Sequence, residues 1–408
     1  MTIAAGDRHI DEATIDLHDP QAFADGPPHA LFAHMREHVP VHHNPKNGDQ
    51  DEFWSLTRYE DIVEANKDWE TFSSARRGTF LTEGGIVPKE FEPLLFNMMD
   101  PPEHNRHRGI LQKVFTMRAV SDREPDVRET ITRLIDGVIE QGQCDFVTDL
   151  AVELPLTVTA NMLGVPHDDR EKLFEWTNQL ADTSITLADK TQTIAEIGAY
   201  IAGLIASRRE NPTDDMLSRL VAAELDGEKL NDLELMAHFI QLMNGGNETT
   251  RNAFAGGMNA LIEFPEQRAA LLADPGLIPR AVDEILRWHT PIMHQARTAT
   301  RAVEIGGVRI AENDKVALWH VSANRDPAAN PDPDRFDVTR SHPKSVTFGA
   351  GRHYCLGHHL ARLELRVCFE ETLRRLPDLE LAGPVTKKPN NSFHWMVSMP
   401  VAFATKGS

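Results

Sequence analysis

The segment FGAGRHYCLG, residues 348–357, carries Cys355 among three glycines. A helical pattern follows, because Leu360, Leu363 and Val367 fall on one face. Cys355 therefore lies at the start of a helix, where unpaired backbone N–H groups and the positive end of the helix dipole favour a thiolate. The glycines let the backbone turn tightly beneath a flat ligand. A single thiolate in this setting predicts an axial haem ligand.

A second group of candidate residues lies at 245–250, in the sequence GGNETT. It interrupts the apolar pattern of residues 231–263, which otherwise predicts one very long helix with Asn231 as N-cap and Glu234 at the capping-box position. Glycine in mid-helix costs roughly 1 kcal/mol relative to alanine. The segment therefore indicates either a helix break, or a site where glycine admits a bulky group beside Glu248. A distortion at such a site would free a carbonyl for water or a diatomic ligand.

Four motifs together resemble cytochrome P450. FGAGRHYCLG (348–357) resembles the haem-binding loop of that family at every fixed position, and GGNETT (245–250) is similar to the oxygen-activation segment of its long central helix. EILR (284–287) resembles the E-x-x-R motif, and PDRF (333–336) resembles the meander segment. Any one motif alone would be weak. Their order makes the resemblance specific, and it covers nearly the whole chain.

The resemblance implies a haem b cofactor, with the Cys355 thiolate as the ligand of its iron. A buried haem carries two propionates, which need cationic or donor partners. Family positions place the cofactor-binding residues at His104, Arg108, Gly246, Arg297, Phe348, Gly349, His353, Cys355 and Gly357. The E-x-x-R motif implies buried structural ion pairs among Glu284, Arg287 and Arg335, which support the cysteine loop.

Glu248 and Thr249 match the acid–alcohol pair of the family, which implies a catalytic role for both. Dioxygen must receive two protons during turnover. Thr249 would hold oxygen and an ordered water by hydrogen bonds, and Glu248 would connect them to solvent. Peroxide-driven members lack this pair, so the resemblance implies turnover driven by electrons.

We expect no flavin or iron–sulfur segment within these 408 residues, so ferredoxin and ferredoxin reductase are the expected electron donors. Ferredoxins are usually acidic, and this chain has a formal net charge of −20. Docking would therefore need a local basic patch. That patch is expected to consist of Arg106, Arg108, Arg362 and Arg366.

The expected substrate is mid-sized and largely hydrocarbon, because the segments that should line the distal wall are mostly apolar. The patterns NSFHWM and GGNETTRN are most similar to bacterial members that act on terpenoids, steroids and branched lipids. At most one polar anchor is expected, at His294, Gln295 or Asn391. The candidate lining residues are Phe80, Leu81, His238, Leu242, Ile292, Met293, Asn391 and Trp395, with Leu95, Phe96 and Met98 from a preceding loop.

The composition is that of a globular protein, with 41% hydrophobic and 25% charged residues. The excess of 62 acidic over 42 basic residues argues against nucleic acid and anionic membrane as partners. Three cysteines are too few for a disulfide framework or a zinc site. No apolar run of about 18 residues is evident, so no membrane span is expected. A monomer in the cytoplasm is the predicted state.

The elements that position these residues are mostly helical. Residues 127–141 and 191–210 show helical periodicity, 52–59 contains a short strand, and 301–320 is predicted to form two short strands around turns. We expect one domain over residues 1–408, mainly α with small β-sheets. The resemblance implies the triangular cytochrome P450 fold, with haem between the long central helix and the cysteine-loop helix.

The predicted function is NAD(P)H-dependent monooxygenation, in which one atom of dioxygen enters an unactivated C–H bond. Two alternatives stay open from the sequence. A peroxygenase would differ in accepting peroxide in place of electrons. A haem-binding sensor without turnover would have no need of Glu248, Thr249 or an apolar substrate cavity.

Overall fold

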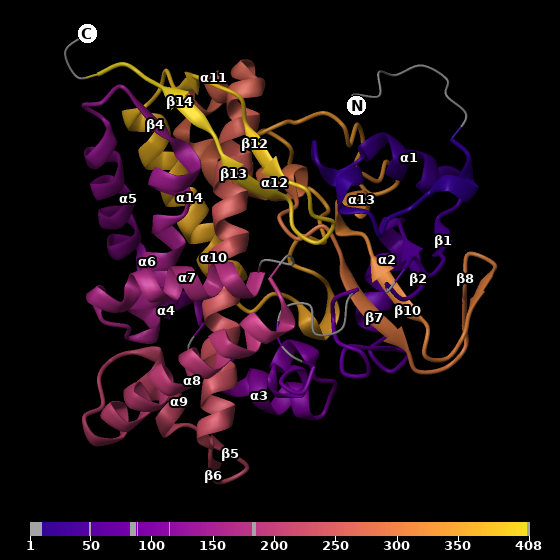
Figure 1. Ribbon diagram of the computed structural model, residues 1–408. Coiled ribbons are helices and arrows are strands. Elements are labelled where there is room, and N and C mark those ends of the chain that lie inside the picture. Colours follow the sequence, from indigo (N-terminus) through magenta and orange to yellow (C-terminus); the bar gives the residue numbers. More distant parts are fainter. Residues whose placement is uncertain are drawn as a thin grey trace. The chain divides into compact units, whose positions relative to one another are not determined.

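The structure is a computed structural model, and it describes residues 10–48, 50–81, 87, 89–113, 115–181 and 185–405. The chain forms two compact units, each assembled from segments that are far apart in the sequence (Figure 1). The first unit contains residues 1–82, 280–354 and 386–397, and the second contains 83–279, 355–385 and 398–408. The single domain expected over the whole chain stays a prediction.

The first unit is built on a five-stranded sheet. Its strands, in spatial order, are β1 (Val41–Asn44), β2 (Phe53–Leu56), β10 (Lys315–Leu318), β7 (Gln295–Ala299) and β3 (Phe72–Ser73). β10 pairs in parallel with β2, and the other neighbouring pairs are antiparallel. Arg297 lies opposite Val316 in the β7–β10 ladder, so this side chain starts from a strand that is paired on both sides.

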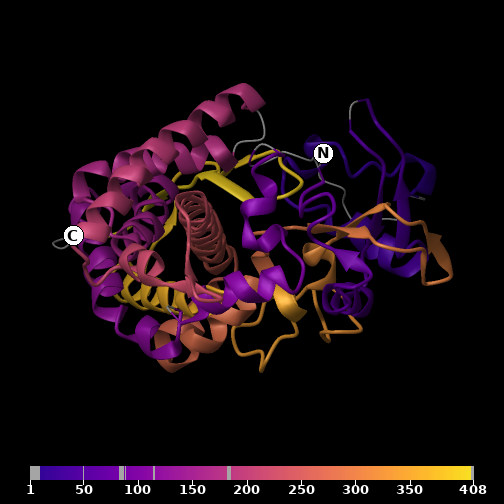
Figure 2. The ribbon, with the colours of Figure 1, turned by 90° about the horizontal axis from the view of Figure 1, so that it is seen from below.

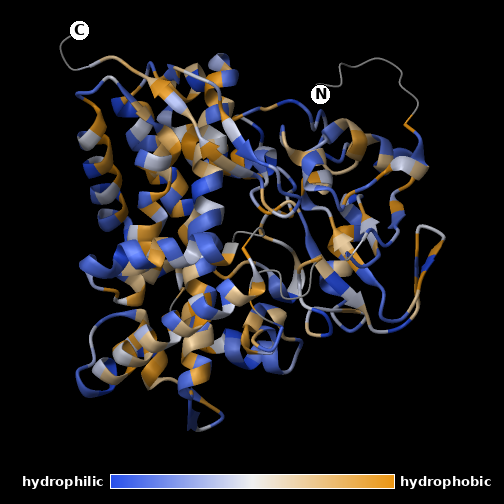
Figure 3. Ribbon diagram, viewed as in Figure 1, coloured by the Kyte–Doolittle hydropathy of each residue, from blue (hydrophilic) through white to orange (hydrophobic). Residues whose placement is uncertain are grey.

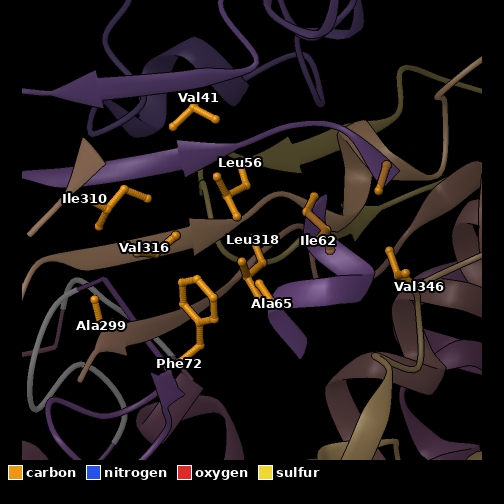
Figure 4. Packing of buried hydrophobic residues seen from close by; sticks show 11 residues of the cluster. Val41, Leu56, Ile62, Ala65, Phe72, Ala299, Ile310, Val316, Leu318 and Val346 are labelled. Atoms are coloured by element: carbon orange, nitrogen blue, oxygen red, sulfur yellow. The ribbon is translucent and has the colours of Figure 1, made fainter. Parts of the chain in front are cut away.

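Aliphatic side chains from the sheet and the helix beside it form one of the cores of this unit (Figure 4). Val41, Leu56, Val316 and Leu318 come from three strands, and Ile62 comes from a helix that follows β2. The unit's helices are α1 (His29–His38), α2 (Tyr59–Lys67), most of α12 (Ile278–His289) and α13 (His320–Ala323). Its remaining strands pair as β8 (Val303–Ile305) with β9 (Val308–Ile310), and as β12 (Thr386–Lys388) with β13 (Trp395–Ser398).

The strand predicted within 52–59 is present as β2, but residues 301–320 form three strands instead of the predicted two. Gly306 and Gly307 both have positive φ angles, of 57° and 79°. Two such residues in succession form the tight turn that matches the twist of a hairpin. The stretch before position 311 is therefore the hairpin β8–β9, and β10 follows it.

The second unit is organised around helix α10 (Asp232–Glu263), which Figure 2 shows nearly end-on among other helices of this unit. The Asn231 side chain accepts hydrogen bonds from the N–H groups of Leu233 and Glu234, and Glu234 returns one to the Asn231 N–H. This confirms the predicted capping box. The helix runs unbroken through Gly245 and Gly246, so the alternative of a break at this point is wrong.

The other helices of this unit carry hydrophobic and hydrophilic residues together (Figure 3), as expected of helices that bury one face. The helices predicted at 127–141 and 191–210 are confirmed as α5 and α8. Besides α10, the helices are α3 (Glu103–Gln112), α4 (Met117–Ser121), α5 (Glu124–Val138), α6 (Glu153–Leu163), α7 (Arg170–Ala181), α8 (Leu187–Glu210), α9 (Met216–Ala222), α11 (Pro265–Ala273) and α14 (His358–Arg375). Its strands are β4 (Gln143–Asp145), β5 (Glu224–Leu225), β6 (Glu228–Lys229), β11 (Glu380–Leu381) and β14 (Pro400–Ala402).

One segment of the described residues, Phe146–Leu163, is long and apolar enough to cross a membrane by composition, which the sequence reading overlooked. It is 78% buried inside the protein. Helices of a protein core commonly have this composition.

Candidate active site

Cys355 is the first residue of the second unit after the chain leaves the first, and helix α14 begins three residues later. Burial raises the pKa of its thiol, while the backbone N–H of Gly357 and the guanidinium groups of Arg108 and Arg362 act in the opposite direction. The Nδ1–H group of His358 donates to the Cys355 carbonyl at 2.9 Å. The backbone donor and the two cations are the groups that stabilise a thiolate.

The glycines before the cysteine belong to the first unit. Gly351 has a φ angle of 68°, and a Cβ atom placed on it would lie 2.4 Å from the carbonyl oxygen of Asn66. Position 351 therefore accepts no side chain without moving backbone. Asn66 is the next-to-last residue of α2, so the loop before Cys355 rests directly on the end of that helix.

Arg297 and His353, two predicted propionate partners, are held by neighbouring parts of the first unit. The buried Arg297 guanidinium donates to Oδ1 of Asn66 at 3.1 Å and to the Ala296 carbonyl at 2.7 Å. The ring Nε2 of His353 lies 3.3 Å from the Ser74 hydroxyl. The acceptors of these Arg297 bonds are neutral oxygens, so they orient the guanidinium without compensating its charge. Sequence reasoning missed Asn66 and Ser74, because neither belongs to a motif.

Arg108 and His104 lie one turn apart on α3 in the second unit. His104 is fully buried, and its ring lies 6.2 Å from that of Phe96. Arg108 is half-buried, and burial lowers the pKa of its guanidinium while Cys355 raises it. This cation and the thiol therefore stabilise one another in their charged forms.

Glu248 and Thr249 are adjacent on α10 but have different partners. The Thr249 hydroxyl donates to the Gly245 carbonyl at 3.0 Å, one turn earlier in the helix. The Glu248 carboxylate forms a buried ion pair with Arg251, which also donates to Oδ1 of Asn178 on α7 at 3.4 Å. Sequence reasoning missed Arg251, although its spacing of three residues from Glu248 was the available signal.

Gly246 has a packing reason that differs from its predicted role. A Cβ atom on Gly246 would lie 2.8 Å from Oγ1 of Thr159, on α6. A Cβ atom on Gly245 would meet no atom within 4 Å among the described residues, and Gly245 is also the acceptor of the Thr249 hydrogen bond. Gly245 is thus the glycine that bonds Thr249, and the contact of Gly246 with the cofactor stays a prediction.

The ion pair of the E-x-x-R motif is present, but Arg335, the further arginine predicted to join it, does not contact Glu284. Glu284 and Arg287 are fully buried and joined by two hydrogen bonds of 2.7 Å. Arg335 is 66% exposed and points to Asp337, because the neighbouring Phe336 takes the buried position. Arg340 instead reaches Glu284, at 3.3 Å.

The predicted substrate-contact residues are distributed over both units, and several of them have other partners. Met293 is part of a buried core of the first unit, and Leu81 packs against that core. The Asn391 amide donates to the carbonyls of Leu17 and His18, which makes it a connection to the N-terminal segment.

Three more of these residues lie in the first unit. Phe80 and Ile292 are half-buried, and Ile292 bridges to Phe393. Trp395 is buried with Lys388 over its ring. In the second unit Leu242 is half-buried on α10, and His238 of the same helix is buried against α3.

Two of the four arginines expected in the basic patch are paired with acidic residues. Arg106 pairs with Glu103 at 2.7 Å and with Asp226. Arg366 pairs with Glu124 and with Glu370. These ion pairs reduce the net positive charge of the patch.

Comparison with known proteins decides the family. The cytochrome P450 family model matches residues 276–402. A methyl-branched lipid omega-hydroxylase of Mycobacterium tuberculosis is 38% identical over 86% of this chain and 84% of its own length. The chain belongs to the cytochrome P450 family. A steroid C26-monooxygenase of M. tuberculosis is 36% identical over 95% of this P450 and 97% of the relative. A Mycobacterium marinum cytochrome P450 solved with pseudoionone has a TM-score of 0.88 at 36% identity, and covers 98% of this chain and 100% of its own.

Membership confirms the P450 fold, the haem b cofactor and the monooxygenase class, and it removes the non-catalytic sensor as an alternative. The residues present fit such a cofactor. Cys355 offers a thiol whose pKa is raised by burial, and the Gly357 N–H and two guanidinium groups favour its thiolate form. The buried Arg297 guanidinium is oriented by the neutral Asn66 oxygen, which suits an anionic propionate.

Proposed function

We propose that this P450 hydroxylates a mid-sized, largely hydrocarbon substrate of the terpenoid, steroid or branched-lipid class. One oxygen atom of dioxygen enters a C–H bond, and the other leaves as water after the uptake of two electrons and two protons. Ferredoxin and ferredoxin reductase carry the electrons from NAD(P)H. The buried Glu248 carboxyl group beside the Thr249 hydroxyl on α10 is the observation that carries this proposal, because two such neighbouring groups can relay protons to bound oxygen.

The haem, when bound, supplies the redox chemistry that divides dioxygen, and the chain supplies protons and position. Thr249 uses its hydrogen toward the Gly245 carbonyl, so its oxygen lone pairs remain to accept a hydrogen bond from water or another O–H group. The Glu248 side chain is buried and paired with Arg251. The pair thus combines a fixed acceptor with a group that exchanges protons.

The substrate class is supported by the relatives and by the polarity of the candidate residues. The relatives named above act on methyl-branched lipids and on steroids. The candidate residues Leu95, Phe96 and Met98 are all buried and apolar. Few charges are available to pair with an ionic substrate, so desolvating one would be costly.

The test is a titration of the purified protein with terpenoids, steroids, fatty acids and small polar aromatics, followed in the Soret band. We expect high-spin shifts mainly with terpenoids and steroids, and hydroxylated product when ferredoxin, its reductase and NAD(P)H are added. Tight binding confined to small charged aromatics would contradict the substrate class. Product formation with peroxide at a rate equal to or above the electron-driven rate would support the peroxygenase alternative. A Cys355→His variant serves as the control, because it should lose the red-shifted band of the reduced carbon monoxide complex.

A further inference from the structure

Two buried histidines in the second unit contact each other in a way that the proposed function does not use. His238 of α10 is 1% exposed, and its Nε2 atom lies 3.0 Å from Nδ1 of His107 on α3. The ring of Phe96 lies 6.3 Å from the His238 ring on another side. His238 is therefore fixed in one orientation by its neighbours.

The other ring nitrogen of His238 is left without a partner. Its Nδ1 atom is buried and has no hydrogen-bond partner among the described residues. Buried polar atoms in folded proteins are nearly always hydrogen-bonded, and the exceptions commonly belong to binding or catalytic sites. This nitrogen is suited to a ligand oxygen.

The helical repeat places His238 on the same side of α10 as the proposed proton relay. Gly245 and Thr249 follow His238 by seven and eleven residues, which is close to two and three turns of an unbroken helix. Along the helix axis these spacings are about 10 Å and about 16 Å. A ligand lying along this face with one end at Thr249 would have its other end near His238.

The surroundings of His238 determine which oxygen it would bind. Burial lowers the pKa of its ring to about 3, and His107 contributes in the same direction, so the ring is neutral near pH 7. The groups that act on His107 include the carboxylates of Glu103 and Glu234. A neutral ring beside acidic residues does not compensate an anion, whereas it can donate to a ketone or accept from a hydroxyl.

We propose that His238, positioned by His107, binds an uncharged hydroxyl or ketone oxygen of the substrate, so that oxidation takes place at the remote end. This assignment rests on the proposed function and adds to it the polarity and orientation of the substrate. It also replaces the earlier candidate Asn391, whose amide bonds the N-terminal segment.

The test uses three small-molecule probes with twelve carbon atoms each, which differ only at one end: dodecan-1-ol, dodecane and dodecanoate. Wild type should bind the alcohol about tenfold more tightly than the alkane in Soret titrations, and more tightly than the carboxylate. His238→Leu should lower the affinity for the alcohol to that for the alkane and leave the alkane unchanged. His238→Gln keeps a hydrogen-bonding group and should restore part of the preference.

A matched control removes a buried histidine elsewhere. His18 belongs to the first unit, and its Nε2 atom lies 3.1 Å from the Pro45 carbonyl oxygen. His18→Leu should leave the preference for the alcohol intact. Equal binding of alcohol and alkane by wild type, or an unchanged preference in His238→Leu, would overturn the anchor.

The positions at which the probes are oxidised distinguish the His238 anchor from the proposed hydroxylase function. Wild type should oxidise dodecan-1-ol at or next to the methyl end, and His238→Leu should spread oxidation along the chain. Oxidation of all three probes without positional preference would reject the anchor and leave the proposed function standing. Absence of product from terpenoids and steroids as well as from these probes would contradict the proposed function, while the titrations would still report on His238.

Discussion

The Thr249 hydroxyl is committed to the Gly245 carbonyl, which leaves only its oxygen lone pairs for the reaction. Thr249→Ala removes this acceptor within an unbroken helix. Haem and substrate binding should persist, while product formed per NAD(P)H consumed should fall about tenfold as electrons go to peroxide or water. Thr249→Ser keeps the hydroxyl and should retain most of the coupling. Unchanged coupling in the alanine variant, with a substrate that wild type hydroxylates efficiently, would make Thr249 structural.

Asn66 orients the guanidinium of Arg297 through a neutral oxygen. Asn66→Asp places a carboxylate at this position, where it would compete with a haem propionate for the same cation. We expect haem to transfer to apomyoglobin about tenfold faster from this variant, and only slightly faster from Asn66→Ala. Asn44→Ala removes another buried asparagine of the same unit, one that bonds Ser55, and should change stability without changing haem transfer. Equal rates for Asn66→Asp and Asn44→Ala would contradict the role of Asn66.

Motif residues were predictable from the sequence because their chemistry depends on local spacing. Cys355 precedes a helix that its own neighbours encode, and Glu248 and Thr249 are adjacent in the chain. Asn66 and Arg340 were not predictable, since their partners Arg297 and Glu284 are more than 50 positions away in the sequence. Arg335 shows the same limit, because only the burial of Phe336 decides that the arginine points outward.

At the scale of elements, α10 meets α14 through a buried carboxyl group. Burial raises the pKa of Glu364 on α14 to about 8, and a hydrogen bond with Thr250 of α10 partly opposes this shift. An unfolded glutamate titrates near pH 4.3, so between about pH 4.3 and 8 the native state binds a proton that the unfolded state has lost. Stability contributed by this group is therefore fully present at low pH and decreases as the pH rises toward 8.

Glu364→Gln mimics the protonated form of the side chain and should remove the decrease in stability that wild type shows as the pH rises toward 8. Its free energy of unfolding in urea should exceed that of wild type by roughly 2–5 kcal/mol at pH 8 and by much less at pH 5. Glu60→Gln, which changes an exposed residue of α2, should show no such dependence. A variant that is less stable than wild type at both pH values would mean that the charged form of Glu364 is the native one.

The contact between α10 and α6 limits the side chain at position 246. Gly246→Ala gains helix propensity but brings a Cβ atom against the Thr159 hydroxyl, so we expect a net loss of about 1–3 kcal/mol. The same change in a Thr159→Ala background should cost nothing or stabilise the protein. The haem spectrum should stay that of wild type in both. A shifted Soret band in the single variant would instead support the predicted contact of Gly246 with the cofactor.

Helices were predicted better than strands, for a physical reason. The periodicity of α5, α8 and α10 repeats over many turns, so a few polar positions do not obscure it. In residues 301–320 each strand has only three or four residues, and the boundary depends on two glycines with positive φ angles. The two adjacent glycines permit that turn, but the sequence alone does not require it.

The net charge of −20 governs how the whole molecule meets an acidic ferredoxin. At about 0.01 M salt the Debye length is about 30 Å, so the net negative charges of the two proteins repel each other. At about 0.1 M salt the Debye length is about 10 Å, and only charges close to the contact surface interact. The rate of electron transfer from reduced ferredoxin should therefore rise between these salt concentrations. It should fall again toward 1 M, where local attraction to a basic patch is also screened.

A variant that lowers the overall charge without touching the basic patch distinguishes these two effects. Asp168→Asn with Glu171→Gln removes two exposed negative charges at the start of α7, so it should raise the rate at low salt and change little at 0.1 M. Reduction by an uncharged photoreduced flavin should not depend on salt and controls for effects on the haem itself. A rate that increases steadily up to 1 M would mean that no basic patch contributes to docking, because only the repulsive part of the interaction would then be present.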